Sequence, residues 1–105
     1  MENNRIELKE QIIRLLKTVY DPEIPVNIYD LGLIYDVAID QDRNVVITMT
    51  LTAPACPAAD FIMEDVRMKI ESMPGVESVD VKITFEPEWH PGLMSEEAKL
   101  ELGFL

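Results

Sequence analysis

The sequence is poor in the residues on which most metal, thiol and nucleic-acid chemistry depends. Among 105 residues there are one cysteine and one histidine, and 9 basic residues stand against 20 acidic ones, for a formal net charge of −11. One cysteine cannot form an internal disulfide, which is typical of a reducing compartment. Phosphate binding depends on clustered lysine and arginine, so we expect neither nucleic acid nor an anionic membrane as a partner.

Long apolar segments are missing as well. The N-terminal sequence MENNRIELKE has no apolar stretch of the kind found in secretory signals, and no run approaches the roughly 20 apolar residues of a membrane helix. We therefore expect a cytoplasmic protein. With 48% hydrophobic residues, the chain suits a single compact domain over residues 1–105.

The hydrophobic pattern predicts the order helix, strand, strand, helix, strand, short helix. Helices are expected at about 4–19 and 57–72, with a short third one from Ser95, and strands at 33–39, 45–52 and 76–85. Each long helix has one apolar stripe and each strand one apolar face. We therefore expect an α+β fold, a two-layer α/β domain in which both helices cover one face of a small mixed sheet.

Three local features add detail to this prediction. Asn4, with Glu7 three residues later, resembles a capping box at the start of the first helix. In the second strand, the alternation of residue types places Thr50 on the relatively polar face. In the third strand, the same alternation places Phe85 on the buried face.

The single thiol, Cys56, lies in the sequence LTAPACPAAD between Pro54 and Pro57. If the second helix begins at Pro57, Cys56 is at its cap, where unpaired backbone N–H groups and the helix dipole stabilise an anion. A thiolate there has a lowered pKa and is a better nucleophile or metal ligand. The alternative is that Cys56 is a small buried hydrophobic residue. The residues alone leave both interpretations open.

Two further places hold candidate polar groups. Asp21 and Glu23, in the sequence DPE, could hold a metal or position a partner, although Asp before Pro is also a common way to open a turn. Thr52, four residues before Cys56, could hydrogen-bond the loop or the thiolate, although threonine is also a common strand residue.

The histidine and the tryptophan favour structural roles. His90 cannot form a zinc site with one cysteine unless other ligands come from elsewhere, so we expect it in a solvated turn. Trp89 is expected to be a core or interface anchor. A thiol enzyme would need a base and oxyanion machinery, and neither is evident in the sequence. We therefore expect a protein that is not an enzyme.

Three segments together resemble the metal–sulfur cluster assembly factor family, which comprises small free-standing SufT-like proteins and their eukaryotic cytosolic relatives. They are DPEIPVNIYDLGLIYDV, TMTLTAPACPAAD and GVESVDVKITFEPEWHPGLMSEEAKLELG. Their motifs are D-P-E-x-P-x-x-I-x-D-L-G-L, T-x-x-x-C-P and W-x-x-x-x-M-S, and the resemblance covers almost the whole chain. It implies a small α/β domain with a role in maturing iron–sulfur proteins, and hence assembly proteins and recipient apoproteins as partners.

The resemblance also implies roles for individual residues. The functional cysteine of the family corresponds to Cys56, its acidic loop positions to Asp21 and Glu23, and its threonine to Thr52. Cys56 would be a labile metal ligand, and the other three would shape its pocket around a transient iron–sulfur cluster. Such clusters usually have four ligands, so one chain with one thiolate would need a homodimer, a partner or a small thiol to complete the set.

A different class of function stays open beside this one. The protein could be an adaptor that binds no cluster and docks apoproteins or other assembly factors through its polar sheet face and the tail around Trp89. Some relatives of the family carry a cysteine-bearing C-terminal extension or a P-loop ATPase. This sequence has no second cysteine and no Walker sequence, so we expect a free-standing assembly factor.

Overall fold

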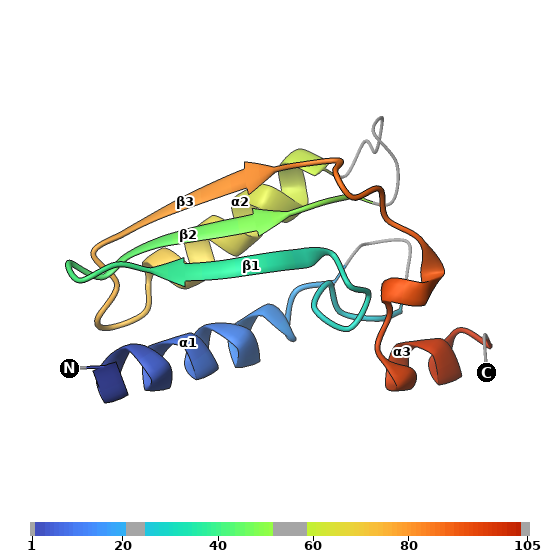
Figure 1. Ribbon diagram of the computed structural model, residues 1–105, viewed down its shortest axis with the longest axis horizontal. Helices are drawn as coiled ribbons and strands as arrows, with labels where there is room; N and C mark the ends of the chain where they lie inside the picture. The colour runs from blue at the N-terminus through green and yellow to red at the C-terminus, as the bar shows by residue number, and fades with distance from the viewer. Residues whose placement is uncertain (1, 21–24, 52–58, 104–105) are drawn as a thin grey trace.

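The computed structural model describes residues 2–20, 25–51 and 59–103 (Figure 1). The elements in chain order are α1 (Glu2–Leu16), β1 (Ile34–Ile39), β2 (Asn44–Met49), α2 (Ala59–Glu71), β3 (Ser78–Ile83), the short 3-10 helix η1 (Pro91–Leu93) and α3 (Glu96–Glu101). Both the order and the mixed α+β class confirm the prediction from the sequence. In the described part of the chain, no helix has the length and apolar character that crossing a membrane requires.

The three strands form one mixed sheet in the order β1-β2-β3 (Figure 1). β1 runs antiparallel to β2, and β2 runs parallel to β3. The register places Val37, Ile47 and Val81 in one row across the sheet. Because side chains alternate along a strand, the apolar residues two positions before and after this row lie on the same face of the sheet. One face of the sheet is therefore apolar across all three strands.

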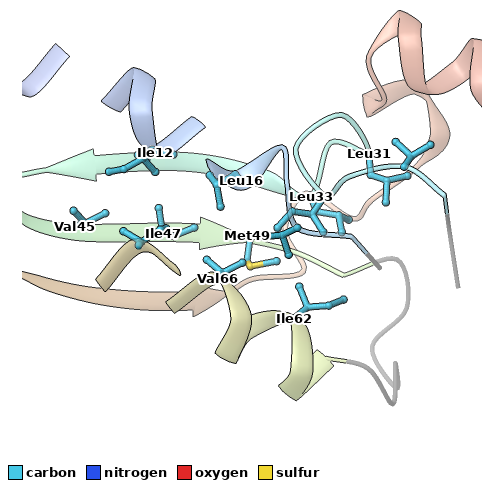
Figure 2. Packing of buried hydrophobic residues seen from close by; sticks show 14 of the residues in the cluster. Ile12, Leu16, Leu31, Leu33, Val45, Ile47, Met49, Ile62 and Val66 are labelled. Atoms are coloured by element: carbon cyan, nitrogen blue, oxygen red, sulfur yellow. The ribbon is translucent and has the colours of Figure 1, made fainter. Parts of the chain in front are cut away.

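Both long helices cover this apolar face. The buried side chains of the two helices belong to one cluster with those of the strands (Figure 2). Full burial of each such side chain contributes about 1.5–3 kcal/mol relative to exposure. The buried helix residues are Leu8, Ile12 and Leu16 of α1 and Ile62, Val66 and Ile70 of α2. The two-layer arrangement predicted from the apolar stripes is confirmed.

The ends of α1 differ from the prediction. The helix begins at Glu2, so Asn4 lies inside its first turns and the predicted capping box is wrong. The helix ends at Leu16, where the Thr18 Oγ1 hydroxyl donates to the Leu15 carbonyl at 2.6 Å. The same carbonyl also accepts from the Thr18 backbone N–H at 2.9 Å, so the chain leaves the α-helical hydrogen-bond pattern here, three residues before the predicted end at about residue 19.

Two predictions about strand faces are also wrong. Phe85 is 39% exposed because β3 ends at Ile83 and Phe85 lies beyond the regular strand. Thr50 is fully buried, although alternation placed it on the polar face. It lies just past β2, where its backbone N–H donates to the Leu33 carbonyl at 2.8 Å. This bond pairs Thr50 with the loop before β1, and the side chain is buried where an exposed sheet face would have left it in solvent.

Candidate functional site

The four residues that the sequence nominates for chemistry lie outside the described residues: Asp21, Glu23, Thr52 and Cys56. Their roles stay predictions, and the structure shows the frame on either side of them. Tyr20 and Pro25 flank the DPE segment, and Leu51 and Ala59 flank the cysteine segment. The first described residue of α2 is Ala59, so the predicted start at Pro57 also lies outside the described residues.

The chain before the DPE segment is joined to the chain after it. Tyr20 and Asn27 form an antiparallel β-bridge, and the Ile28 backbone N–H donates to the Val19 carbonyl at 2.8 Å. Val19 and Ile28 are both buried. The two ends of the segment that carries Asp21 and Glu23 are therefore held beside each other by backbone hydrogen bonds and a shared apolar contact region.

The C-terminal tail is fastened to the loop before β1. The indole N–H of Trp89 donates to the Leu31 carbonyl at 2.7 Å, and the Ser95 backbone N–H donates to the Asp30 carbonyl at 2.8 Å. Ser95 also begins α3, as predicted, because its hydroxyl accepts from the Ala98 backbone N–H at 3.1 Å. Trp89 is half-buried against the core, so it is an anchor within the chain.

Gly32 lets this loop approach the tail closely. Its backbone has a positive φ of +82°, and an added Cβ would lie 2.8 Å from the Leu93 carbonyl carbon. Only glycine takes this conformation routinely, and no side chain fits the space. In the D-L-G-L motif, the residues at Asp30, Leu31 and Gly32 thus hold the tail in place. This part of the motif therefore has a structural role, which is to fasten the C-terminal tail to the loop before β1.

His90 lies in an exposed turn, as predicted. Its Nδ1 accepts a hydrogen bond of 3.1 Å from the Gly92 backbone N–H and caps η1. Within residues 2–20, 25–51 and 59–103, no group of three or more histidine, cysteine, aspartate or glutamate side chains is arranged to hold a metal ion.

The hydroxyl of Thr50 is a polar group that the sequence pattern missed. It lies two residues before Thr52, it is fully buried, and no hydrogen-bond partner for Oγ1 is found among the described residues. A buried hydroxyl without a partner costs free energy. No local pattern marks this position, because Thr50 fits the alternation of an ordinary strand and is covered only by the fold around it.

An apolar hollow of about 390 Å³ lies between Tyr20, four residues past the end of α1, and one side of α2. It is lined by Tyr20, Phe61, Ile62, Glu64, Asp65 and Met68. Three of these are large side chains left in solvent: Phe61 is 80% exposed, Met68 58% and Tyr20 54%. The sequence analysis missed Phe61, although Phe61 and Met68 are seven residues apart and so share one helical face beside the buried stripe of α2.

Two residues that line the hollow are close in sequence to the segments that carry the predicted site residues. Tyr20 directly precedes Asp21, and Phe61 follows Cys56 by five residues. The sequence alone could not show that residues so far apart in the chain, on α1's C-terminal side and on α2, face one common space. The fold therefore brings the two flanks of the candidate site to one surface.

The acidic residues of this hollow are paired along α2 itself. Glu64 forms an ion pair with Arg67, which also contacts Glu71 at 3.1 Å, and Asp65 pairs with Lys69 at 3.4 Å. Hydrogen bonding to Glu64 raises the pKa of the exposed Arg67 guanidinium. Exposed pairs of this kind contribute little to stability. They do balance the charge at the rim, which leaves the hollow mainly apolar in character.

The sequence is similar to a known protein family and to named proteins of bacteria. The family described as "Iron-sulfur cluster assembly protein" matches residues 9–83. A protein of Porphyromonas gingivalis (strain ATCC BAA-308 / W83), named an Fe-S protein maturation auxiliary factor, is 65% identical over 105 residues, with 100% of both chains covered. The Fe-S protein maturation auxiliary factor YitW of Bacillus subtilis (strain 168) is 44% identical over 96 residues, which are 91% of this chain and 94% of that one.

The fold is shared with a solved structure. The crystal structure of a domain of unknown function, DUF59, from Bacillus anthracis superimposes with a TM-score of 0.88 at 38% sequence identity, covering 94% of each chain. The matched region of the sequence includes most of α1, all of α2 and all three strands. This chain belongs to the iron–sulfur cluster assembly protein family.

Proposed function

We propose that this protein assists the maturation of iron–sulfur proteins by holding a cluster in transit, with Cys56 as a labile thiolate ligand. Thr52, Asp21 and Glu23 shape the pocket around that thiolate. The observation that supports this proposal is the common hollow lined by Tyr20 and Phe61, which adjoin the two segments concerned. The family match supports it too, because residues 9–83 include all four candidate residues.

The chemistry required of the chain is ligand exchange. Cys56 loses its proton to become a ligand of the cluster iron, since the thiolate and not the thiol binds metal. During release, a recipient thiolate forms a bond to the iron as the Cys56 sulfur leaves, and no electron moves. One chain supplies one thiolate, so a cluster with four ligands needs a homodimer with two copies of Cys56, a partner or a small thiol. The role is that of a cytoplasmic carrier and not of an enzyme.

Anaerobic reconstitution with iron and sulfide tests the proposal directly. We expect wild type to gain iron and cluster absorbance and Cys56→Ser to gain neither. Ala38→Ser is the matched control, because Ala38 is an exposed residue of β1 and the change introduces the same hydroxyl group away from the hollow. Native mass spectrometry of the reconstituted protein gives the number of chains per cluster. If the iron content after reconstitution is equally negligible in wild type and Cys56→Ser, the protein does not bind a cluster directly.

The second candidate function is an adaptor that binds no cluster and docks assembly proteins or recipient apoproteins. The observation that favours it is the exposure of Phe61, Met68 and Tyr20, because large exposed apolar side chains that gather on one surface mark interaction sites. If the protein is an adaptor, wild type and Cys56→Ser should bind a purified recipient apoprotein equally well. If the protein is a carrier, Cys56→Ser should no longer transfer iron to that apoprotein.

A further inference from the structure

A second hollow adjoins the apolar one, and Tyr20 lines both. It measures about 250 Å³ and lies between residues 25–30 and α3. Its lining residues are Tyr20, Pro25, Val26, Asn27, Asp30, Glu97, Ala98 and Glu101. Three of these described residues, Asp30, Glu97 and Glu101, carry a carboxylate, and none of the described lining residues is a lysine or an arginine. We call it the acidic hollow.

The carboxylates of the acidic hollow are not balanced by cations in the way that those of α2 are. Glu97 and Glu101 are four residues apart on α3, where like charges repel each other across one turn. Asp30 accepts a hydrogen bond of 2.7 Å from the Asn27 side-chain amide, a neutral donor. Among the described residues, the ion pairs are those of α2, and none includes these three carboxylates. A cation from outside would relieve this repulsion.

The apolar hollow supplies the other half of a recognition surface. Phe61 is the most exposed of its large side chains, at 80%, and it lies in the first turn of the described α2. Aromatic residues and methionine are enriched where protein partners bind, and a few such anchors supply most of the binding energy. Tyr20 joins this apolar surface to the acidic hollow, because it has an apolar ring and a polar hydroxyl.

We infer that the two hollows form one docking surface for a segment of a partner protein that carries a large apolar side chain and, close to it, a lysine or arginine. The apolar side chain would enter the hollow at Phe61 and Met68, and the basic group would reach Glu97 and Glu101. This inference rests on the proposed function only for the kind of partner, a recipient apoprotein or an assembly protein. It does not require Cys56 to hold a cluster.

Charge disfavours the other occupants of such a surface. A second copy of this chain carries the same net charge of −11 and would bring acidic groups to an acidic hollow. Nucleic acid and anionic membranes are repelled for the same reason. A basic segment is attracted, and the attraction also raises its rate of association and fixes its orientation. The partner that fits is therefore a different protein with a basic and apolar segment.

Titration with peptides tests the inference. The probes are short labelled peptides in a Gly–Ser background, each with one phenylalanine or leucine and one arginine at varied spacing, together with matched peptides in which glutamate replaces arginine. The protein is Cys56→Ser, so that neither a cluster nor thiol chemistry contributes. We expect an arginine peptide to bind and to shift the backbone NMR signals of Tyr20, Phe61 and Glu97. The glutamate peptides should bind at least about tenfold more weakly, and added salt should weaken the arginine peptide.

Matched variants separate this surface from general effects. Phe61→Ser and the double variant Glu97→Gln/Glu101→Gln should each weaken binding at least about tenfold, as expected for anchors of an interface. The controls are Ile6→Ser, which removes another exposed apolar side chain, and Glu7→Gln/Glu10→Gln, which removes the same charge from α1. Circular dichroism checks that each variant is folded. Equal binding of arginine and glutamate peptides, or signal shifts confined to other surfaces, would overturn the inference.

The reconstitution experiment is independent of this one. Glu97→Gln/Glu101→Gln should take up as much iron as wild type, because these two carboxylates supply no cluster ligand and do not line the hollow on which the carrier role rests. If Cys56→Ser binds the peptides but wild type takes up no iron, the proposed carrier role fails and the docking surface stands. If wild type takes up iron and no arginine peptide binds at this surface, the docking surface fails and the carrier role stands.

Discussion

The indole N–H of Trp89 donates a hydrogen bond of 2.7 Å to the carbonyl oxygen of Leu31, 58 residues earlier in the chain. Next to it, the Ser95 backbone N–H donates to the carbonyl of Asp30 at 2.8 Å. The D-L-G-L and W-x-x-x-x-M-S segments, which are far apart in the sequence, therefore fit each other. Their role is to fix the loop before β1, and with it the surface on which Tyr20 lies.

Trp89→Phe should lower the free energy of unfolding by about 1–3 kcal/mol. The smaller ring removes the donor to the Leu31 carbonyl, and a buried acceptor that loses its partner costs about that much. Urea unfolding followed by far-UV circular dichroism measures the change, because the variant loses the only tryptophan as a fluorescent probe. Phe85→Leu, at an exposed position beyond β3, serves as the control. A change in Trp89→Phe no larger than that of the control would contradict the prediction.

Gly32→Ala should destabilise the fold by about 2–5 kcal/mol, the sum of a left-handed backbone penalty and of overpacking. The new Cβ would lie 2.8 Å from the Leu93 carbonyl carbon, so the tail must move. Gly103→Ala is a matched control with the same φ of +82° and no atom within 4 Å of its added Cβ. It should cost about 1–2 kcal/mol at most. Equal losses of stability in the two variants would show that the close approach to Leu93 is unimportant.

The order of the elements could be predicted because each of them is regular. Apolar residues every second position marked the strands, and the stripe of Ile62, Val66 and Ile70 marked the buried side of α2. The same alternation failed at Thr50 and Phe85, which lie just outside the regular strands. Beyond a strand end, burial depends on which distant segment covers the position, and local periodicity carries no information about that.

The candidate site was predictable only in part. The motif named Cys56 and its companions, and the structure describes their flanks. The hollow between Tyr20 and Phe61 depends on how α2 packs beside the end of α1, which spacing within either helix does not determine. The same holds for the acidic hollow, because Asp30 and Glu97 line one space only after the tail is fastened to the loop before β1, for example by the hydrogen bond between the Ser95 and Asp30 backbones.

Thr50→Val should leave the fold as stable as wild type or stabilise it by about 1 kcal/mol. The change keeps the side-chain shape and removes a buried hydroxyl for which no partner is found among the described residues. Thr84→Val is the control, since the Thr84 hydroxyl accepts from the Glu86 backbone N–H at 3.2 Å and its loss should be destabilising. Urea unfolding measures both. A loss of more than about 1 kcal/mol in Thr50→Val would show that this hydroxyl is hydrogen-bonded in solution.

The double variant Asp21→Asn/Glu23→Gln should lower the affinity of reconstituted protein for iron by about 10–100-fold, the usual effect of removing groups that orient a metal ligand. The reason is the proposed arrangement, in which both carboxylates shape the pocket of Cys56. The control is Asp36→Asn/Asp80→Asn, which removes two charges from exposed positions of β1 and β3. Iron content after dialysis against a chelator, compared at matched protein concentration, gives the affinity ratio.

Three results distinguish the explanations of that experiment. A loss of iron confined to Asp21→Asn/Glu23→Gln supports the shared pocket. An equal loss of iron in the control variant shows that net charge, and not position, determines iron retention. Removing two negative charges from a chain of net charge −11 weakens the attraction of any cation. Full retention in both variants would remove Asp21 and Glu23 from the pocket. The thiolate of Cys56 would then act without them, and the DPE segment would be assigned to the turn that its Asp-Pro sequence also favours.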